Sequence, residues 1–259
     1  MRNDGVLVSV VMPVYNDSRF ICETISSVLN QTHSNFELLI IEDCSKDNSL
    51  EIIKEFMDKR IKLFVNETNK GAAYSRNKGI KEATGEFIAF LDGDDLWTPD
   101  KLEKQLEFMI SNKYDFSYTN YEVIDDAGNK TGTYFTGPKK VTHRKFVRMN
   151  YVGCLTAMYR KSACPVLVVP EHIKRRNDYA LWLKVSEKCN CYLLNECLAK
   201  YRTRASGSIT TSNKEGLFSY HKILFQSLYG YGTLRCFYIF CRGVFYSICK
   251  KILYRKNLF

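Results

Sequence analysis

The sequence lacks the short motifs that mark several common classes of nucleotide-binding protein. No Gly-x-Gly-x-x-Gly segment follows a candidate strand, which argues against a dinucleotide-dependent enzyme. No Walker lysine motif is present, which argues against a P-loop kinase. The 259 residues also contain no internal repeat and no linker rich in glycine, proline or serine. We therefore expect one catalytic domain with a C-terminal appendage.

The ten cysteines include no Cys-x-x-Cys pair. They are scattered, mostly among apolar neighbours, and are predicted to be reduced residues of the core or of an interface. Cys189, Cys191 and Cys197 match no known zinc-ligand spacing, which disfavours a zinc site. The first residues lack the basic, apolar and small-residue succession of a secretory signal, so we expect the protein in the cytoplasm.

Acidic residues are absent from the last part of the chain, where the positive charge is concentrated. The net charge is +10, and residues 218–259 hold seven Lys and Arg residues and no acid, which leaves +3 for residues 1–217. The same segment holds twelve aromatic residues. This pattern predicts amphipathic helices lying on the inner face of the cell membrane, attracted to anionic lipid. The alternative is a C-terminal helix packed on the catalytic domain.

Long apolar runs are also absent from this segment. Arg235 and Arg242 interrupt every apolar stretch well below the roughly 20 residues that a membrane crossing requires. No recognition motif for nucleic acid accompanies the basic and aromatic residues, so nucleic acid is not an expected partner. We expect a catalytic domain over residues 1–217 and a peripheral membrane-associating part over residues 218–259.

Apolar strands alternate with helices through the first hundred residues. The pattern predicts strands over residues 8–12, 36–41, 61–65 and 87–91, separated by helices over residues 18–30, from residue 47 and over residues 71–81. Such alternation indicates parallel βαβ units in an α/β fold, with a mostly parallel central sheet flanked by helices. Farther on, the sequence predicts helices over residues 99–111 and 178–188, and strands over residues 115–123, 155–159 and 191–194. Residues 130–150 could not be assigned.

Three carboxylates follow the fourth strand directly. Asp92, Asp94 and Asp95 surround Gly93 at the end of the apolar run 87–91. Like charges so close together need a counter-charge, and hard oxygen ligands suit Mg²⁺ or Mn²⁺. Because Mg²⁺ usually binds one or two carboxylates together with substrate phosphates, a nucleotide is expected nearby. The alternative is an acidic turn before a helix with Thr98 as N-cap and Pro99 as first residue.

The carboxyl ends of the other strands carry polar residues as well. Ligands of open α/β sheets bind at such ends, so the four ends are expected to form one nucleotide site. Tyr15 can lie against a base, and Asp43 can accept a hydrogen bond from it. Arg76 and Lys70 can meet phosphate charge.

Five segments together resemble the family 2 inverting glycosyltransferases, which have the GT-A fold. The resemblance covers about the first 210 residues and rests on residues 11–16, 42–49, 69–77, 90–97 and 177–183. It implies a metal-dependent enzyme that uses a nucleotide sugar donor, UDP-linked, with Mn²⁺ or Mg²⁺. The implied donor-binding residues are Pro13, Val14, Tyr15, Asp43, Asn69, Lys70, Arg76, Asp92, Asp94 and Arg204.

Within this set the resemblance assigns particular roles. Asp92 faces the ribose side, Asp94 binds the cation, and Asp178 is the catalytic base. The alternative for Asp178 is a purely structural role as the N-cap of its helix. The family usually has an acid where this chain has Asn177, so one member of an acid pair is missing. Arg204 stands where many relatives have histidine. Arg204 is expected either to contact a donor or acceptor phosphate or to belong to a mobile lid loop that takes no part in the reaction.

The expected reaction is transfer of a hexose or N-acetylhexosamine to a lipid-diphosphate-linked saccharide, forming a β-linkage. This acceptor and the basic aromatic segment indicate assembly of a bacterial surface polysaccharide such as O-antigen or capsule. Two alternatives remain open, a sugar nucleotidyltransferase and a non-catalytic module that binds sugar nucleotides. The first usually needs a glycine-rich basic loop after the first strand, and residues 15–18 are not one.

Overall fold

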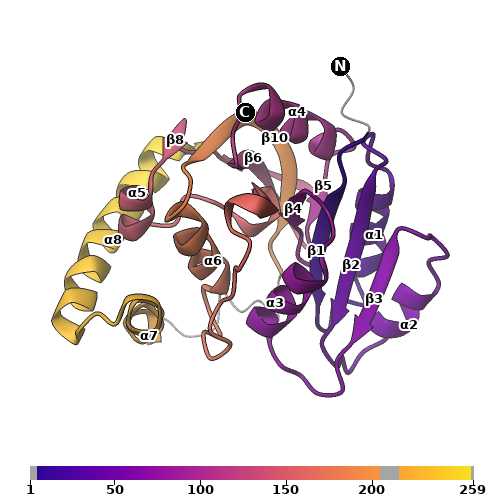
Figure 1. The fold of residues 1–259 in the computed structure, drawn as a ribbon, viewed down its shortest axis with the longest axis horizontal. Helices are drawn as coiled ribbons and strands as arrows, with labels where there is room; N and C mark the ends of the chain where they lie inside the picture. Colours follow the sequence, from indigo (N-terminus) through magenta and orange to yellow (C-terminus); the bar gives the residue numbers. More distant parts are fainter. Residues whose placement is uncertain (1–4, 205–215, 258–259) are drawn as a thin grey trace.

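The computed structural model of the protein describes residues 5–204 and 216–257 (Figure 1). Its first half alternates strictly between strand and helix, as predicted. The elements are β1 (Val8–Val14), α1 (Ile21–Leu29), β2 (Phe36–Glu42), α2 (Ser49–Lys54), β3 (Ile61–Val65), α3 (Ala72–Glu82) and β4 (Phe87–Phe90). The strands β1, β2 and β4 are buried throughout, which is why their sequences are nearly continuous apolar runs.

The second half adds antiparallel strands and the remaining helices. Its elements are β5 (Leu96–Trp97), α4 (Lys101–Ser111), β6 (Phe116–Ile124), β7 (Lys130–Phe135), β8 (Lys140–Val141), α5 (His143–Arg148), β9 (Met158–Arg160), α6 (Asn177–Ser186), β10 (Cys191–Arg202), α7 (Leu217–Tyr229), α8 (Thr233–Tyr254) and β11 (Arg255–Asn257). Residues 130–150 thus form two strands and a short helix.

One mixed sheet runs through the molecule in the order β11-β7-β6-β9-β4-β1-β2-β3. Strand β1 pairs in parallel with β2 and β4, and β2 pairs in parallel with β3. Strand β9 is antiparallel to both β4 and β6, which makes the sheet mixed in its second half. Because β1, β2 and β4 run the same way, their carboxyl ends lie at one edge of the sheet, as the βαβ pattern requires.

Three sequence-based boundaries were wrong. Helix α4 begins at Lys101 with Asp100 as its N-cap, because the Thr98 backbone N–H donates to the Leu198 carbonyl and holds Thr98 outside the helix. Residues 154–156 form a 3₁₀ turn, so only the end of the predicted strand 155–159 is strand. Strand β10 extends to Arg202 instead of ending at Leu194.

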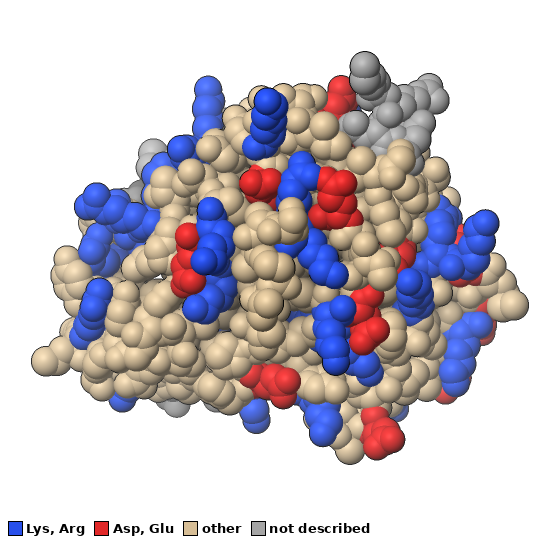
Figure 2. Space-filling view, in the orientation of Figure 1, with Lys and Arg blue, Asp and Glu red and all other residues tan. Residues whose placement is uncertain are grey.

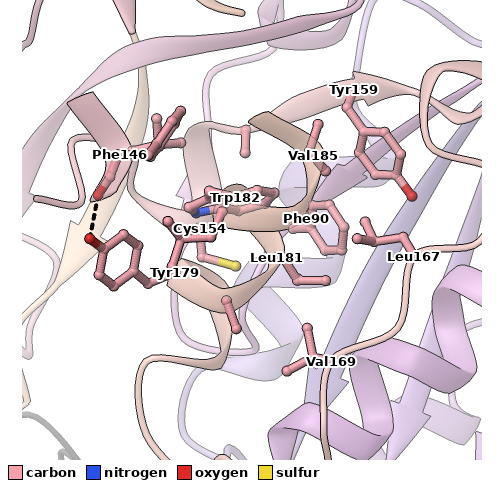
Figure 3. Close-up of a cluster of buried hydrophobic side chains, with 14 of the residues drawn as sticks. Phe90, Phe146, Cys154, Tyr159, Leu167, Val169, Tyr179, Leu181, Trp182 and Val185 are labelled. Atoms are coloured by element: carbon pink, nitrogen blue, oxygen red, sulfur yellow. Dashed lines mark hydrogen bonds between the residues drawn. The ribbon is translucent and has the colours of Figure 1, made fainter. Parts of the chain in front are cut away.

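Helix α6 is held against the sheet by an aromatic cluster. Figure 3 shows Trp182 between Phe90 of β4 and the side chains around Phe146 of α5. The Trp182 ring lies 5.4 Å from Phe90 and 5.5 Å from Phe116, and its side chain is fully buried. The Tyr179 hydroxyl donates to the Phe146 carbonyl, which ties α6 to α5. This packing fixes the first turn of α6, where Asp178 lies.

Helices α7 and α8 lie at the opposite end of the molecule from β2 and β3 (Figure 1). Their inner residues Leu224, Phe225, Cys236 and Ile239 belong to the same buried cluster as Trp182. Their outer residues are apolar as well, with Phe237 54% and Phe245 64% exposed. Within residues 5–204 and 216–257, no helix has the length and apolar character that crossing a membrane would require.

The cysteines fit the prediction only in part. Nine are described, and all nine are free. Cys154, Cys164, Cys191 and Cys236 are buried, as core residues should be, whereas Cys22, Cys197 and Cys241 are exposed. The exposed positions lie on a helix or a strand surface, where a small side chain needs no partner.

Candidate active site

The carboxyl ends of β1, β2 and β4 form what we call the acidic edge, which consists of Asp17, Asp43, Asp92, Asp94 and Asp95. Gly93 is essential to its shape, because a side chain at this position would collide with the carboxylate of Asp17. The Gly93 carbonyl also accepts a hydrogen bond from the Thr24 hydroxyl at 3.0 Å. The glycine therefore lets a carboxylate from the end of β1 approach the turn after β4.

Arg204 neutralises part of this acidic edge. Its Nε donates to Asp94 Oδ2 at 2.6 Å, and its Nη2 forms an ion pair with Asp17. Burial and the nearby charge of Asp94 together raise the pKa of Asp17 to about 6, although Arg204 opposes both effects. Burial also raises the pKa of Asp94, again opposed by Arg204. A guanidinium thus occupies the position where these carboxylates require a positive charge.

Asp95 has a structural role. It is almost completely buried, and its Oδ1 accepts the Arg202 backbone N–H at 2.9 Å, which anchors the end of β10. Burial raises the pKa of Asp95 well above its usual range, and Asp94 and Asp92 add to the effect. Arg202 is buried too, and its Nη2 donates to Glu23 at 2.6 Å. Asp95, whose role the sequence left open, therefore positions the end of the strand that leads to Arg204.

Asp43 holds the loop between β3 and α3. Its Oδ1 accepts the Lys70 backbone N–H at 2.9 Å, and its Oδ2 accepts that of Gly71 at 2.7 Å. Gly71 has a φ of 88°, a conformation that favours glycine. The Asn66 side chain also donates to Asp43, at 2.8 Å. The carboxylate thus shapes the backbone on which Asn69 and Lys70 are exposed.

Arg76 joins the acidic edge to helix α6. Its guanidinium is buried and donates to both Asp92 and Asn177. Asn177 therefore supplies an amide oxygen to Arg76 at the position where the family usually has an acid. The charges of Asp92 and Asp178 raise the pKa of Arg76 against the effect of burial. The guanidinium remains a cation and fixes the start of α6 relative to β4.

Asp178 lies in the first turn of α6, two residues after Arg176. Burial raises the pKa of Asp178, and the positive charge of Arg76 opposes this shift. The Asn150 side chain donates to its Oδ2 at 3.4 Å. A carboxylate that has a raised pKa, is held in place by α6 and lies within the electrostatic influence of Arg76 is suited to act as a general base.

A cavity of about 480 Å³ opens beside Asp178. We call it the α8 cavity. Its walls come from α5, α6, α7 and α8, and they include Arg148, Asn150, Arg176, Asp178, His221 and Phe240. Its volume is within the roughly 300–1,000 Å³ common for small-molecule sites. Asp178 therefore lines the cavity and also lies near Arg76, which contacts Asp92 and Asn177.

The structure brings most of the predicted donor-binding residues to the acidic edge. Pro13 and Val14 are buried in β1, whereas Tyr15 follows the strand and is 40% exposed. The roles of all ten residues in binding a donor remain predictions. Sequence reasoning missed Asp17 and Arg202 as members of the site. The position of Asp17 just after the predicted first strand could have indicated its place in the site. For Arg202 the sequence offers no indication beyond its position two residues before Arg204.

Among the residues that the structure describes, no group of three or more His, Cys, Asp or Glu side chains is arranged to hold a metal ion. A cation at the acidic edge would therefore need oxygen ligands from a substrate to complete its coordination. Carboxylates of the kind found in Asp94 are suitable partial ligands for Mg²⁺ or Mn²⁺.

This fold, with carboxylates at the strand ends and a further carboxylate at the start of a helix, is that of the GT-A glycosyltransferases. The chain belongs to glycosyl transferase family 2, whose model matches residues 9–167. It is 41% identical over 211 residues to the Escherichia coli UDP-Glc:alpha-D-GlcNAc-diphosphoundecaprenol beta-1,3-glucosyltransferase WfgD, covering 82% of each chain. It is 38% identical over 230 residues to the putative teichuronic acid biosynthesis glycosyltransferase TuaG of Bacillus subtilis (strain 168), covering 86% of this chain and 90% of that one.

A solved structure confirms the fold. The structure of S. aureus TarS 1-349 in complex with UDP-GlcNAc matches with a TM-score of 0.72 and 21% sequence identity, covering 92% of this chain and 71% of that chain. The match extends beyond the family model and includes a large part of the second half of the chain. The expected GT-A architecture and membership of family 2 are thus both confirmed.

Proposed function

We propose that the protein transfers a hexose or N-acetylhexosamine from a UDP-sugar to a hydroxyl of a lipid-diphosphate-linked saccharide, forming a β-linkage in bacterial surface polysaccharide assembly. The observation that carries this proposal is the similarity to WfgD, whose name gives a UDP-glucose donor and a diphosphoundecaprenol acceptor. A second relative, WfaP of Escherichia coli, bears the same activity name. The position of Asp178 beside a cavity supports it, because an acceptor must reach the base.

The proposed chemistry is a single displacement. Asp178 takes the proton of the acceptor hydroxyl as its oxygen attacks the anomeric carbon, and the bond from that carbon to the nucleoside diphosphate breaks. The raised pKa of Asp178 makes it a better proton acceptor than an ordinary aspartate. Displacement from the opposite side inverts the anomeric centre, so an α-linked donor gives a β-linked product.

We propose that Asp94 holds a divalent cation together with the donor diphosphate. The arrangement fits an oxygen-ligated cation, because Asp94 and Asp17 converge on one position that the Arg204 guanidinium now neutralises. When bound, Mn²⁺ or Mg²⁺ would stabilise the charge of the departing diphosphate. Asp92, held by Arg76, would lie on the ribose side of this position, and Asp43 would order the loop of Asn69 and Lys70.

We also propose that α7 and α8 hold the enzyme peripherally on the cytoplasmic face of the membrane. Large apolar residues are exposed on the outer face of α8, notably Leu234, Phe237, Tyr238 and Phe245. Figure 2 shows that basic side chains lie among uncharged ones at the end of the molecule formed by α7 and α8, whereas acidic and basic side chains lie side by side over much of the rest. Such a surface suits anionic lipid.

A donor screen tests the proposed reaction. Purified protein with Mn²⁺ and a lipid-diphosphate-linked GlcNAc acceptor is given common nucleotide sugars one at a time, and release of nucleoside diphosphate is measured. We expect release with a UDP-sugar only when the acceptor is present, and NMR of the product should show a β-linkage. No release with any donor, or an α-linked product, would contradict the proposal.

Vesicle flotation tests the membrane part. Phe237→Ser combined with Phe245→Ser should release the protein from vesicles containing phosphatidylglycerol while UDP binding stays unchanged. Val166→Ser with Val168→Ser is a matched control, because these residues are also exposed but lie outside α7 and α8. Equal flotation of the two double variants would show that α8 does not contact lipid.

A further inference from the structure

The α8 cavity contains two arginines that form no described ion pair, although the charge of Arg176 lies close enough to Asp178, in the same cavity, to oppose the raised pKa of that carboxyl. Within residues 5–204 and 216–257, neither Arg148 nor Arg176 has an acidic side chain at ion-pair distance, whereas Arg76, Arg202 and Arg204 all have one. The Arg148 guanidinium lies over the Tyr246 ring at 5.5 Å, and its buried Nε has no described hydrogen-bond partner. Two cations in a partly buried cavity favour an anionic ligand.

His221 adds a hydrogen-bond donor to this cavity. Its ring is buried, and Arg176 Nη1 lies 3.4 Å from its Nδ1. Since a guanidinium can only donate, Nδ1 must accept, so the proton of the neutral ring is on Nε2. Burial and the charge of Arg176 lower the pKa of His221 to about 4, which keeps the ring neutral near pH 7. Its buried Nε2–H has no partner among the described residues.

The remaining wall of the cavity is apolar and comes from α8. Phe240, Gly243 and Val244 line it, and they share one face of the helix because they are three and four residues apart. A side chain added at Gly243 would come within 3.1 Å of the Arg148 carbonyl, so this glycine lets α8 pack closely on α5. Val244 is also 43% exposed, so the apolar wall reaches the surface next to Phe245.

We propose that the α8 cavity binds the diphosphate of an isoprenoid-linked acceptor, with Arg148 and Arg176 contacting phosphate oxygens and Phe240 and Val244 contacting the start of the hydrocarbon chain. This inference rests on the proposed function. An anion joined to an apolar chain is the ligand that a cavity with two arginines outside any described ion pair and an apolar helix face would recognise. Because Asp178 lines the same cavity, the first sugar of the acceptor would lie next to the base.

Binding of a small analogue tests the cavity without requiring turnover. Farnesyl diphosphate is titrated into the 259-residue protein by calorimetry, with EDTA present and no donor. Arg148→Gln and Arg176→Gln should each weaken binding by about tenfold or more, the usual range for losing a charge-assisted hydrogen bond. Arg144→Gln is the matched control, because Arg144 is exposed on the same helix and does not line the cavity. It should bind like the wild type.

A second variant blocks the cavity without removing charge. Val244→Trp should weaken farnesyl diphosphate binding to a similar extent, and its melting temperature reports whether the fold survives. Inorganic diphosphate and dihexanoyl phosphatidylglycerol separate the possible sources of phosphate. The first should bind at least tenfold more weakly than farnesyl diphosphate, since it lacks the chain, and the second should not displace it.

The outcomes separate this inference from the proposed function. Unchanged farnesyl diphosphate affinity in Arg148→Gln and Arg176→Gln would overturn it, even if the wild type transfers sugar. Equal affinity for inorganic diphosphate, or displacement by dihexanoyl phosphatidylglycerol, would also overturn it. Selective loss in the two arginine variants and in Val244→Trp would support the cavity as a diphosphate site, even if the donor screen found no transfer.

Discussion

The acidic edge and the α8 cavity use arginine in opposite ways. At the acidic edge, Arg76 pairs with Asp92 and Arg204 with Asp94, so the protein supplies its own counter-charges. In the α8 cavity, Arg148 and Arg176 face no described carboxylate at ion-pair distance. On our proposals, a cation with its nucleotide would have to displace Arg204 at the first region, whereas the second region would accept an anion without breaking a described ion pair.

Asp178 lies where the two regions meet. It lines the α8 cavity, and it also lies near Arg76, which is bonded to Asp92 of the acidic edge. In the proposed function two substrates meet at one base, and this connection would give each substrate its own region. On that proposal, donor and acceptor binding can be disrupted separately, while Asp178 is common to both.

The largest effect is expected for Asp178→Asn. The amide cannot accept the proton of the acceptor hydroxyl, so kcat should fall by about 10²–10⁴-fold, the range for loss of a general base. The dissociation constant of UDP should change little and that of farnesyl diphosphate should not rise, because the variant removes a negative charge from the α8 cavity and no cationic contact from either region. Nucleoside diphosphate release and calorimetry provide these values, with Asp58→Asn in a distant loop as control. Unchanged turnover would remove Asp178 as the base.

A somewhat smaller effect is expected for Asp94→Asn, which acts only on the acidic edge. Loss of a cation ligand should reduce kcat by about 10²-fold and abolish the dependence of the remaining activity on Mn²⁺. Farnesyl diphosphate binding in EDTA should be unaffected. A Mn²⁺ titration of activity checks the first expectation, and a titration curve like that of the wild type would argue against Asp94 as a metal ligand.

Arg204→Gln should have the opposite effect on cation binding and increase the affinity for Mn²⁺. Mn²⁺ must displace the Arg204 guanidinium from Asp94, so removing it should tighten Mn²⁺ binding in the absence of donor by about tenfold, the equivalent of one charge-assisted contact. Electron paramagnetic resonance of free Mn²⁺ measures this affinity. Arg19→Gln is the control, since Arg19 is an exposed arginine paired with Asp126. Weaker Mn²⁺ binding would show that Arg204 does not compete with the cation.

The two regions also differ in how far the sequence predicts them. The carboxylates of the acidic edge follow apolar strands directly, so the βαβ pattern places Asp43, Asp92 and Asp94 at one sheet edge without any knowledge of packing. The contact between Asp17 and Arg204 joins residues from opposite ends of the catalytic domain, and nothing local indicates it. The place of these carboxylates at the sheet edge was therefore predictable, but their pairing was not.

The α8 cavity could not be predicted from the sequence, and the reason is physical. Arg148, His221 and Phe240 lie on three different helices and Arg176 precedes a fourth, so their meeting depends on tertiary contacts such as the close approach of α8 at Gly243. Strand β10 shows the same limit on a smaller scale. Its pairing with β6 shifts register between Leu194 and Cys197, and the polar residues of this bulge make the strand look as if it ended there.

The smallest effect is a shift in pH dependence, and it tests the connection between the two regions. Burial raises the pKa of Asp178, so kcat/KM should fall as the pH drops through a value above that of an ordinary aspartate. Arg76 lowers this pKa, so Arg76→Gln should move the acidic limb of the profile to higher pH, whereas Arg76→Lys retains the charge and should leave it nearly in place. Because Arg76 is buried, each variant is compared at a temperature well below its measured melting point. Identical acidic limbs in both variants would mean that the charge of Arg76 does not reach Asp178, and that the base responds only to its own burial.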